Sequence, residues 1–415
     1  MVEEQKYLVL EGMKAGVALK VKPDFLESLP YIFSHWPYEI TTSPIEFFAS
    51  IEWSDNRYRL SSPYMEKVDR YREPVNAICA IVAELAWQRL REDPSLLCLH
   101  GAAAEFSGRL VVFPATRRAG KSTLSVAMNA AGIRMFTDDF LPVSVSDNGV
   151  ISGISSGVSP RLRLPVPDQI GENAKDYMRR RQTLSNKQYT YVSPLKTENA
   201  CFNESAPVGG FVFLDRQDGA LAELKEISKA DALKTIIKQN FSRAGNAADI
   251  LAMLEFLSNN LPSYLLRYDQ AEPAIEILKQ KFTGWDAKAP GYQPRAKLID
   301  ESAHGAKTYT VYKKVTEGRF EQAEGVKVVS TDGQKFLTGR NGQSIHYLNE
   351  GAAMIWQILS EPASAAEAVE ILHAAFPEQE VAQLERDVKA CFKDFARNGL
   401  LKKTDSVESS EMVAE

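Results

Sequence analysis

The segment that most constrains the fold is ATRRAGKS, residues 115–122. An apolar run, Leu110–Phe113, precedes it, and a run suited to a helix, Ser122–Ala131, follows and stops at Gly132. Backbone N–H groups at the start of such a helix point at a phosphate, and the helix dipole favours its negative charge. The sequence therefore predicts a strand, a phosphate-binding loop and a helix here, rather than a chance GKS in a surface turn.

Within this loop, the Lys121 ammonium can neutralise β- and γ-phosphate oxygens, and the Ser122 hydroxyl can ligate Mg²⁺. Ala115 stands where the usual pattern has glycine, and alanine serves there if its φ is negative. Arg117 and Arg118 either contact the nucleotide or an acidic substrate, or are solvated. The predicted nucleotide-binding residues are Ala115, Thr116, Arg117, Arg118, Ala119, Gly120, Lys121, Ser122 and Thr123.

Two adjacent carboxylates, Asp138 and Asp139, end the next strand-like run, MFTDD. Paired carboxylates that face a phosphate loop can hold Mg²⁺ and accept a hydroxyl proton, which are the two tasks of phosphoryl transfer. Elsewhere such a pair is more often a turn or a helix cap. The position after a strand favours the functional interpretation.

The composition is that of a globular chain, and 415 residues exceed what one core usually takes. A formal net charge of -5 argues against a protein that coats nucleic acid, which needs a basic surface. The four cysteines lack the paired spacing of a disulfide framework or a zinc site. No signal peptide or membrane span is recognisable, so we expect a cytoplasmic protein with neither a membrane nor nucleic acid as partner. The oligomeric state stays open, and a homo-oligomer is one alternative.

The chain is predicted to have five parts. They are an N-terminal α+β region (1–95), a domain with alternating strands and helices around the phosphate loop (96–282), a linker (283–305), a C-terminal α+β domain (306–403) and a disordered acidic tail (404–415). In the first part we expect helices after Pro23 and over Glu73–Leu90, beside short strands.

In the C-terminal part, the runs TYTVYKKV, QKFLTG and SIHYLN predict strands, and three helices follow. Ser364 is expected to cap the second helix in a capping box with Glu367. The third helix is expected to have one apolar stripe, which includes Leu384 and Val388.

With these motifs, residues 96–282 resemble the HPr serine kinase/phosphorylase family and its HprK-related relatives. The resemblance rests on LHG (residues 99–101), the phosphate loop (115–122) and TDD (137–139), in that order. It implies an α/β, PEP-carboxykinase-like P-loop kinase domain, and transfer of the γ-phosphate of ATP to a serine hydroxyl.

The same resemblance implies roles for single residues. Asp139 would be the general base, His100 and Lys121 would be catalytic, and Ser122 would be a Mg²⁺ ligand, with Asp138 as the second choice for metal ligand or base. Arg243, in NFSRAG, is a weak local match to an arginine late in the family's domain.

The chain departs from that family in one segment. The family has a metal-binding glutamate where this chain reads SPRLRLP, residues 159–165, without an acid. Either Asp138 and Asp139 hold the metal alone, or activity is lost. Arg161 and Arg163 in this segment either contact substrate or are exposed strand ends.

Residues 309–402 resemble the PqqD-like family, whose members are peptide-binding modules also called RiPP recognition elements. The resemblance rests chiefly on LNEGAAMIW, and it implies a winged-helix-like unit of three strands and three helices. Such a module can bind a leader peptide as an added strand. The alternatives are a structural cap on the kinase and a DNA reader, which the balanced charges of the third helix disfavour. The predicted peptide-binding residues are Ser344, Ile345, His346, Tyr347, Leu348, Leu384 and Val388.

Together these features predict an ATP- and Mg²⁺-dependent kinase that phosphorylates a Ser or Thr of a peptide or small protein, such as a RiPP precursor. The C-terminal module would deliver this substrate. Two alternatives remain: a non-catalytic, nucleotide-binding peptide carrier, and a small-molecule kinase on the same fold.

Overall fold

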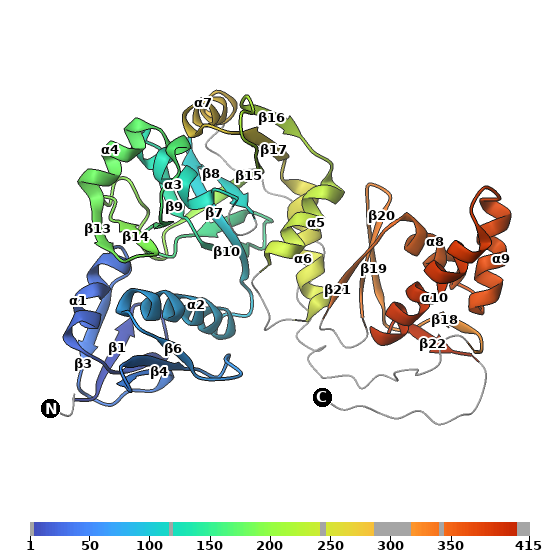
Figure 1. Cartoon of the computed structure of the whole chain (residues 1–415), viewed down its shortest axis with the longest axis horizontal. Coiled ribbons are helices and arrows are strands. Elements are labelled where there is room, and N and C mark those ends of the chain that lie inside the picture. Colours follow the sequence, from blue (N-terminus) through green and yellow to red (C-terminus); the bar gives the residue numbers. More distant parts are fainter. Residues whose placement is uncertain (1–3, 116–118, 241–245, 286–316, 340–343, 405–415) are drawn as a thin grey trace. The chain divides into compact units, whose positions relative to one another are not determined.

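A computed structural model describes residues 4–115, 119–240, 246–285, 317–339 and 344–404. The chain divides into two compact units, Met1–Ala244 with Leu257–Pro294 and Gly245–Phe256 with Arg295–Glu415. Helices and strands alternate in both units, as Figure 1 labels them, which confirms a mixed α/β protein. Among the described helices, none combines the length and apolar character needed to span a bilayer.

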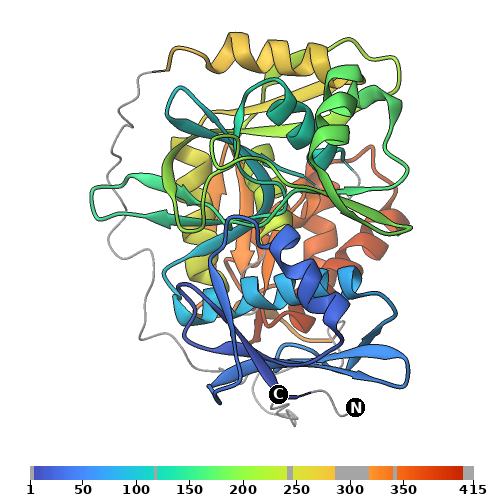
Figure 2. The ribbon, with the colours of Figure 1, turned by 90° about the vertical axis from the view of Figure 1, so that its left-hand side faces the viewer.

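The N-terminal region consists of a six-stranded sheet and two helices. The strand order is β3-β1-β2-β4-β5-β6. Helix α1 (Pro23–Ile32) and helix α2 (Pro74–Glu92) each begin at a proline, whose fixed φ suits the first helical position. Figure 2 shows both helices lying along the sheet, in blue. The strands are β1 (Lys6–Leu10), β2 (Gly16–Lys20), β3 (Tyr38–Thr41), β4 (Phe47–Ser54), β5 (Arg57–Ser61) and β6 (Asp69–Tyr71).

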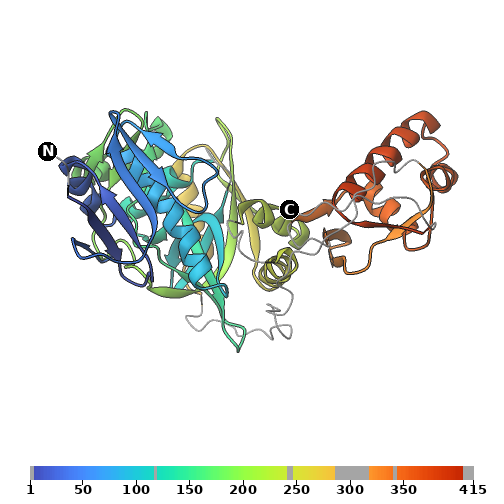
Figure 3. The same cartoon turned by 90° about the horizontal axis from the view of Figure 1, so that it is seen from below.

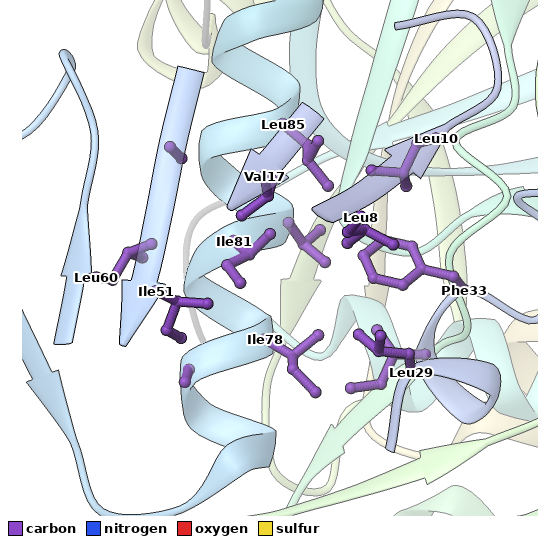
Figure 4. Close-up of a cluster of buried hydrophobic side chains, with 14 of the residues drawn as sticks. Leu8, Leu10, Val17, Leu29, Phe33, Ile51, Leu60, Ile78, Ile81 and Leu85 are labelled. Atoms are coloured by element: carbon purple, nitrogen blue, oxygen red, sulfur yellow. The ribbon is translucent and has the colours of Figure 1, made fainter. Parts of the chain in front are cut away.

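Buried aliphatic side chains from the sheet and both helices form the core of this region. Leu8, Leu29 and Ile81 meet there, as Figure 4 shows. The same cluster includes Cys98 and Tyr191, which come from strands beyond residue 96. The N-terminal region therefore shares a core with the strands that follow it, and the boundary placed between residues 95 and 96 stays a prediction.

The second sheet has eight strands and carries the phosphate loop. Its order is β11-β10-β7-β8-β15-β17-β16, and β9 also pairs with β7. The neighbours β8, β15 and β17 run parallel, while the remaining pairings are antiparallel. The strands are β7 (Leu97–Phe106), β8 (Arg109–Pro114), β9 (Arg134–Thr137), β10 (Phe140–Val145), β11 (Ile151–Ile154), β15 (Ser205–Arg216), β16 (Glu223–Glu226) and β17 (Ser263–Tyr268).

The same part of the chain contains a third, smaller sheet and several helices. Strands β12 (Arg161–Arg163), β13 (Gln182–Ser185) and β14 (Tyr189–Val192) form a three-stranded sheet of order β12-β14-β13. The helices are α3 (Lys121–Ala130), α4 (Glu172–Arg181), α5 (Lys229–Gln239), α6 (Ala247–Asn260) and α7 (Ala271–Phe282). Helix α3 starts directly after the phosphate loop, and Gly132, with a φ of 79°, follows its end as the sequence predicts.

The described residues from 317 to 404 form two small sheets and three helices, drawn in orange and red in Figure 3. Ser364 and Glu367 form the predicted capping box at the start of α9. Asp332 and Gly333 both have positive φ, as a tight turn between β19 and β20 needs. The elements are β18 (Phe320–Gln322), β19 (Lys327–Thr331), β20 (Gln334–Thr338), β21 (Ile345–Leu348), α8 (Glu350–Ile358), α9 (Ala365–Ala375), α10 (Val381–Arg397) and β22 (Leu401–Lys403).

Some predictions concern residues that the structure does not describe. The strand expected over residues 308–315, most of the proposed linker and the acidic tail from residue 405 lie outside the described residues. Of the three strands expected in the C-terminal unit, the two that can be compared are present as β20 and β21.

Candidate functional site

Strand β7 brings the three sequence motifs together. In the antiparallel registers of β7, Gly101 lies opposite Pro114 at the end of β8, and His100 lies opposite Phe140 of β10. The turn between β9 and β10 carries the two adjacent aspartates, and the Gly101 N–H donates to the Asp139 carbonyl at 2.9 Å. His100, which precedes Gly101 on β7, therefore lies between the phosphate loop and the two aspartates.

A chain of polar contacts runs through His100. The Lys121 ammonium lies 3.2 Å from His100 Nε2, and His100 Nδ1 lies 3.2 Å from Asp139 Oδ1. Lysine can only donate, so Nε2 accepts from Lys121 and Nδ1 carries the proton that is donated to Asp139. This arrangement orients the ring, with Nε2 toward Lys121 and Nδ1 toward Asp139. It joins three of the four residues that were predicted to be catalytic, and the fourth, Arg243, lies outside the described residues.

The phosphate loop keeps the geometry that its sequence predicts at both ends. Gly120 has a φ of 92°, and a Cβ there would lie 2.8 Å from the Tyr268 hydroxyl, so only glycine fits. Ala115 is not among the residues with positive φ, so alanine is compatible with the first position of the loop. Its carbonyl accepts a 2.6 Å hydrogen bond from Lys121, which is 8% exposed. The loop therefore holds the lysine close to where its backbone would bind phosphate.

Asp138 is buried, with 6% of its surface exposed. Its Oδ2 accepts the backbone N–H of Arg161 at 3.1 Å, and Ser122 donates a side-chain hydrogen bond to the same carboxylate. Burial, together with the charge of Asp139, raises the pKa of Asp138 to about 6. A buried carboxylate with a raised pKa favours the binding of a cation.

The pKa of Asp139 is shifted in the opposite direction, and the Asp139 side chain is 45% exposed. Desolvation would raise the pKa of Asp139, but the hydrogen bond from His100 and the charges of Arg161 and Lys121 outweigh it and lower the pKa. The two neighbouring carboxylates therefore differ in character: Asp139 stays ionised and accessible, while Asp138 is enclosed.

Arg161 lies beside this pair, in the segment where a glutamate was expected from the family resemblance. Its guanidinium is 4.6 Å from the Tyr189 ring centroid and hydrogen-bonds to Cys79, whose Sγ is 2.8 Å from the Tyr191 hydroxyl. Burial would lower the pKa of Arg161, but Cys79, Tyr191 and Asp139 raise it above its usual value. A fixed positive charge therefore accompanies the two carboxylates, and it is held in part from helix α2.

The side chains around Ser122 suit a magnesium ion that is shared with phosphates. The described residues contain no group of three or more His, Cys, Asp or Glu that would form an all-protein metal site. Mg²⁺ at a phosphate site needs only one or two carboxylates, because phosphate and water oxygens complete its shell. Asp138 and the hydroxyl of Ser122, already in contact, supply that donor set.

Not all predicted site residues can be placed. Thr116, Arg117, Arg118 and Arg243 lie outside the described residues. Ala119 precedes Gly120, and Thr123 follows Ser122 in the first turn of α3. Sequence reasoning did not include Cys79, Tyr189 or Tyr191 in the site, and no local pattern marks them, because they reach it from elements far along the chain.

The C-terminal unit has a groove of about 1040 Å³ between β21 and α10. Five of the seven predicted peptide-binding residues line it: His346, Tyr347, Leu348, Leu384 and Val388. Ser344 and Ile345 do not, although the Ser344 hydroxyl is 2.7 Å from His346 Nε2. Among the described strands, β21 lies at one edge of the sheet of order β19-β20-β21, so its outer backbone groups face away from the paired strand β20. The lining residues Met354, Cys391 and Asp394 were not predicted, although the helical spacing from Leu384 would have included the last two.

Comparison with known protein families finds a match in the C-terminal unit. Residues 336–401 match the family described as coenzyme PQQ synthesis protein D (PqqD), so the chain carries a PqqD domain near its C-terminus. No curated protein matches the chain.

Two solved structures show likenesses to separate parts of the chain. A lasso peptide synthetase B1 complexed with the leader peptide is 28% identical, over 20% of this chain and 96% of that chain, with a TM-score of 0.19. An HPr(Ser) kinase/phosphatase from Coxiella burnetii is 12% identical, over 44% of this chain and 93% of that chain, with a TM-score of 0.22. The family match confirms the resemblance of the C-terminal unit to PqqD-like proteins. The TM-scores of both solved structures are too low to support an argument about fold or activity.

Proposed function

We propose that this protein is an ATP- and Mg²⁺-dependent kinase that phosphorylates a Ser or Thr hydroxyl of a peptide or small protein. The observation that carries the proposal is the contact chain from Lys121 through His100 to Asp139, beside a phosphate-loop helix. Phosphoryl transfer needs a cation on the phosphates and a base on the acceptor hydroxyl, and these residues offer both within one site.

In this proposal each residue of the site has a separate role. Lys121 and the backbone N–H groups at the start of α3 bind the phosphates of ATP. Asp139 accepts the acceptor hydroxyl's proton while the hydroxyl oxygen bonds to the γ-phosphorus, and the bond from that phosphorus to the β,γ-bridging oxygen breaks and leaves ADP. His100 orients Asp139 and keeps it ionised. A Mg²⁺ ion held by Ser122 and Asp138 would neutralise phosphate charge.

The C-terminal unit would deliver the substrate. Its PqqD match and the groove beside an edge strand support the binding of an extended leader segment, whose main chain adds to β21. Tethering the acceptor in this way raises its concentration at the kinase site. We infer that a RiPP precursor is the substrate class, that residues 96–282 form a PEP-carboxykinase-like P-loop domain, and that the C-terminal unit is related to winged helices.

One observation favours a second candidate, a peptide carrier that binds nucleotide without transferring phosphate. Arg161 stands beside Asp138 in the segment where the resembled family has a metal-binding glutamate. A fixed guanidinium there competes with a metal ion for the same carboxylates.

Mass spectrometry of short peptides encoded beside the gene, incubated with the protein, ATP and Mg²⁺, separates the two candidates. A gain of one phosphoryl group on Ser or Thr, lost in Lys121→Ala and Asp139→Asn, supports the kinase. Asp147→Asn is the matched control, because Asp147 is an exposed aspartate in a turn of the same unit. Peptide binding without any phosphoryl gain favours the carrier, and binding of neither peptide nor ATP contradicts both.

A further inference from the structure

The groove between β21 and α10 is apolar at its base. Val388 and Ile355 are buried there, and Met354, Leu384 and Cys391 remain partly exposed. An extended segment that pairs with β21 would turn alternate side chains toward these residues. The base of the groove therefore accommodates aliphatic or aromatic side chains.

The charged residues that line the groove are predominantly acidic. Three carboxylates, of Glu350, Asp387 and Asp394, stand against one guanidinium, of Arg397, which leaves two negative charges in excess. His346 adds no positive charge at neutral pH, because its burial lowers the pKa of the imidazole.

Helix α10 is charge-balanced as a whole, so this excess belongs to one face. Its other basic residues, Arg386, Lys389 and Lys393, do not line the groove. Lys389 is paired with Glu385, which also lies outside the lining, at 3.2 Å. The groove face of the helix therefore differs from the helix average that the sequence shows.

Asp387 and Asp394 are seven residues apart, which places them on the same side of α10 two turns from each other, about 10.5 Å along the axis. Cys391 lies between them. The charge of Asp394 partly offsets the lowering of the His346 pKa by burial, and it adds to the raising of the Cys391 pKa by burial. Its carboxylate is therefore close to both of these groove residues. Among the described residues, no ion pair includes Asp394.

We propose that this groove binds an extended peptide segment that carries a lysine or arginine next to an aliphatic or aromatic residue. The basic side chain pairs with Asp394 and Asp387, the apolar one occupies the base of the groove, and the main chain pairs with β21. This inference rests on the peptide delivery proposed above and specifies the chemistry of the delivered segment. Charge complementarity at the rim gives selectivity and speeds encounter.

The test uses the immobilised full-length protein and a random mixture of synthetic dodecapeptides, with the bound fraction identified by mass spectrometry. We expect Lys and Arg beside apolar residues to be enriched in that fraction. The double variant Asp387→Asn/Asp394→Asn should bind the selected peptides several-fold to about tenfold more weakly, as expected for two partly solvated ion pairs. Asp387→Lys/Asp394→Lys should select Asp and Glu instead.

The matched control is Glu370→Gln/Glu385→Gln, which removes the same charge from exposed positions of α9 and α10 outside the groove. It should leave the affinity and the selection unchanged. Enrichment of apolar residues alone, unaffected by the aspartate variants, overturns this inference but leaves peptide delivery intact. Retention of no peptide by the wild-type protein overturns the inference and the proposed delivery together.

Discussion

Replacing Lys121 with alanine removes a side-chain cation from the start of α3, directly after the phosphate loop. The ammonium is buried, and it donates to the Ala115 carbonyl at 2.6 Å and to His100 at 3.2 Å. The ammonium is therefore already oriented before any nucleotide binds, so the Lys121 side chain loses little conformational freedom on binding. The change should weaken ATP binding and should reduce phosphoryl transfer more strongly.

The size of the effect follows from the type of contact. A hydrogen bond to a charged group contributes about 1.5–3 kcal/mol, and about 1.4 kcal/mol corresponds to a tenfold change in affinity. We expect the dissociation constant for ATP to rise between about tenfold and about 150-fold. The low exposure of Lys121 favours the upper part of that range, because screening by water is weak there.

Isothermal titration calorimetry with ATP measures this change. A melting curve must accompany it, because the variant leaves the Ala115 carbonyl without its Lys121 donor. Lys187→Ala is the matched control, since Lys187 is an exposed lysine in the same unit. An unchanged dissociation constant in a folded Lys121→Ala protein would refute the assignment of this loop as the nucleotide site.

Three further changes probe other parts of the chain. Asp139→Asn should lower the phosphorylation rate about 10²- to 10⁴-fold, the usual contribution of a general base, with ATP affinity nearly unchanged in calorimetry; an equal loss of both would contradict its role as base. Burial raises the pKa of Glu84, so the ionised carboxylate opposes folding once the pH rises above the ordinary carboxyl value. Glu84→Gln should therefore raise the melting temperature more at pH 7 than at pH 4, and an equal difference at both pH values would argue against this cause. Ser364→Ala removes the cap of α9 and should cost about 1 kcal/mol, measured by denaturant unfolding against Ser360→Ala, an exposed serine outside the capping box.

Local signals in the sequence predicted much of the fold. The helices that begin at Pro23 and Pro74, the capping box at Ser364 and the turn at Asp332 each depend on a few neighbouring residues. Strands β18 and β22 were not predicted. They are three residues long and pair across about 80 positions of the chain, and no short-range pattern encodes such a pairing.

The site shows the same division between local and distant information. Lys121 and Asp139 belong to short motifs, so it could be predicted from the sequence that they lie near each other. The contact of Arg161 with Cys79 joins residues 82 positions apart and depends on how the N-terminal helix α2 packs. Spacing in the sequence carries no information about that packing.

The contact between Arg161 and Cys79 also bears on how this chain can be shortened. Helix α2 holds the guanidinium beside the two carboxylates, and Tyr191 belongs to the same buried cluster as Leu8 and Ile81. A protein truncated to begin at residue 96 would expose that cluster to water and release one support of Arg161. The first 95 residues thus help to hold Arg161 beside Asp138 and Asp139, and under the proposed function a minimal active fragment should retain them.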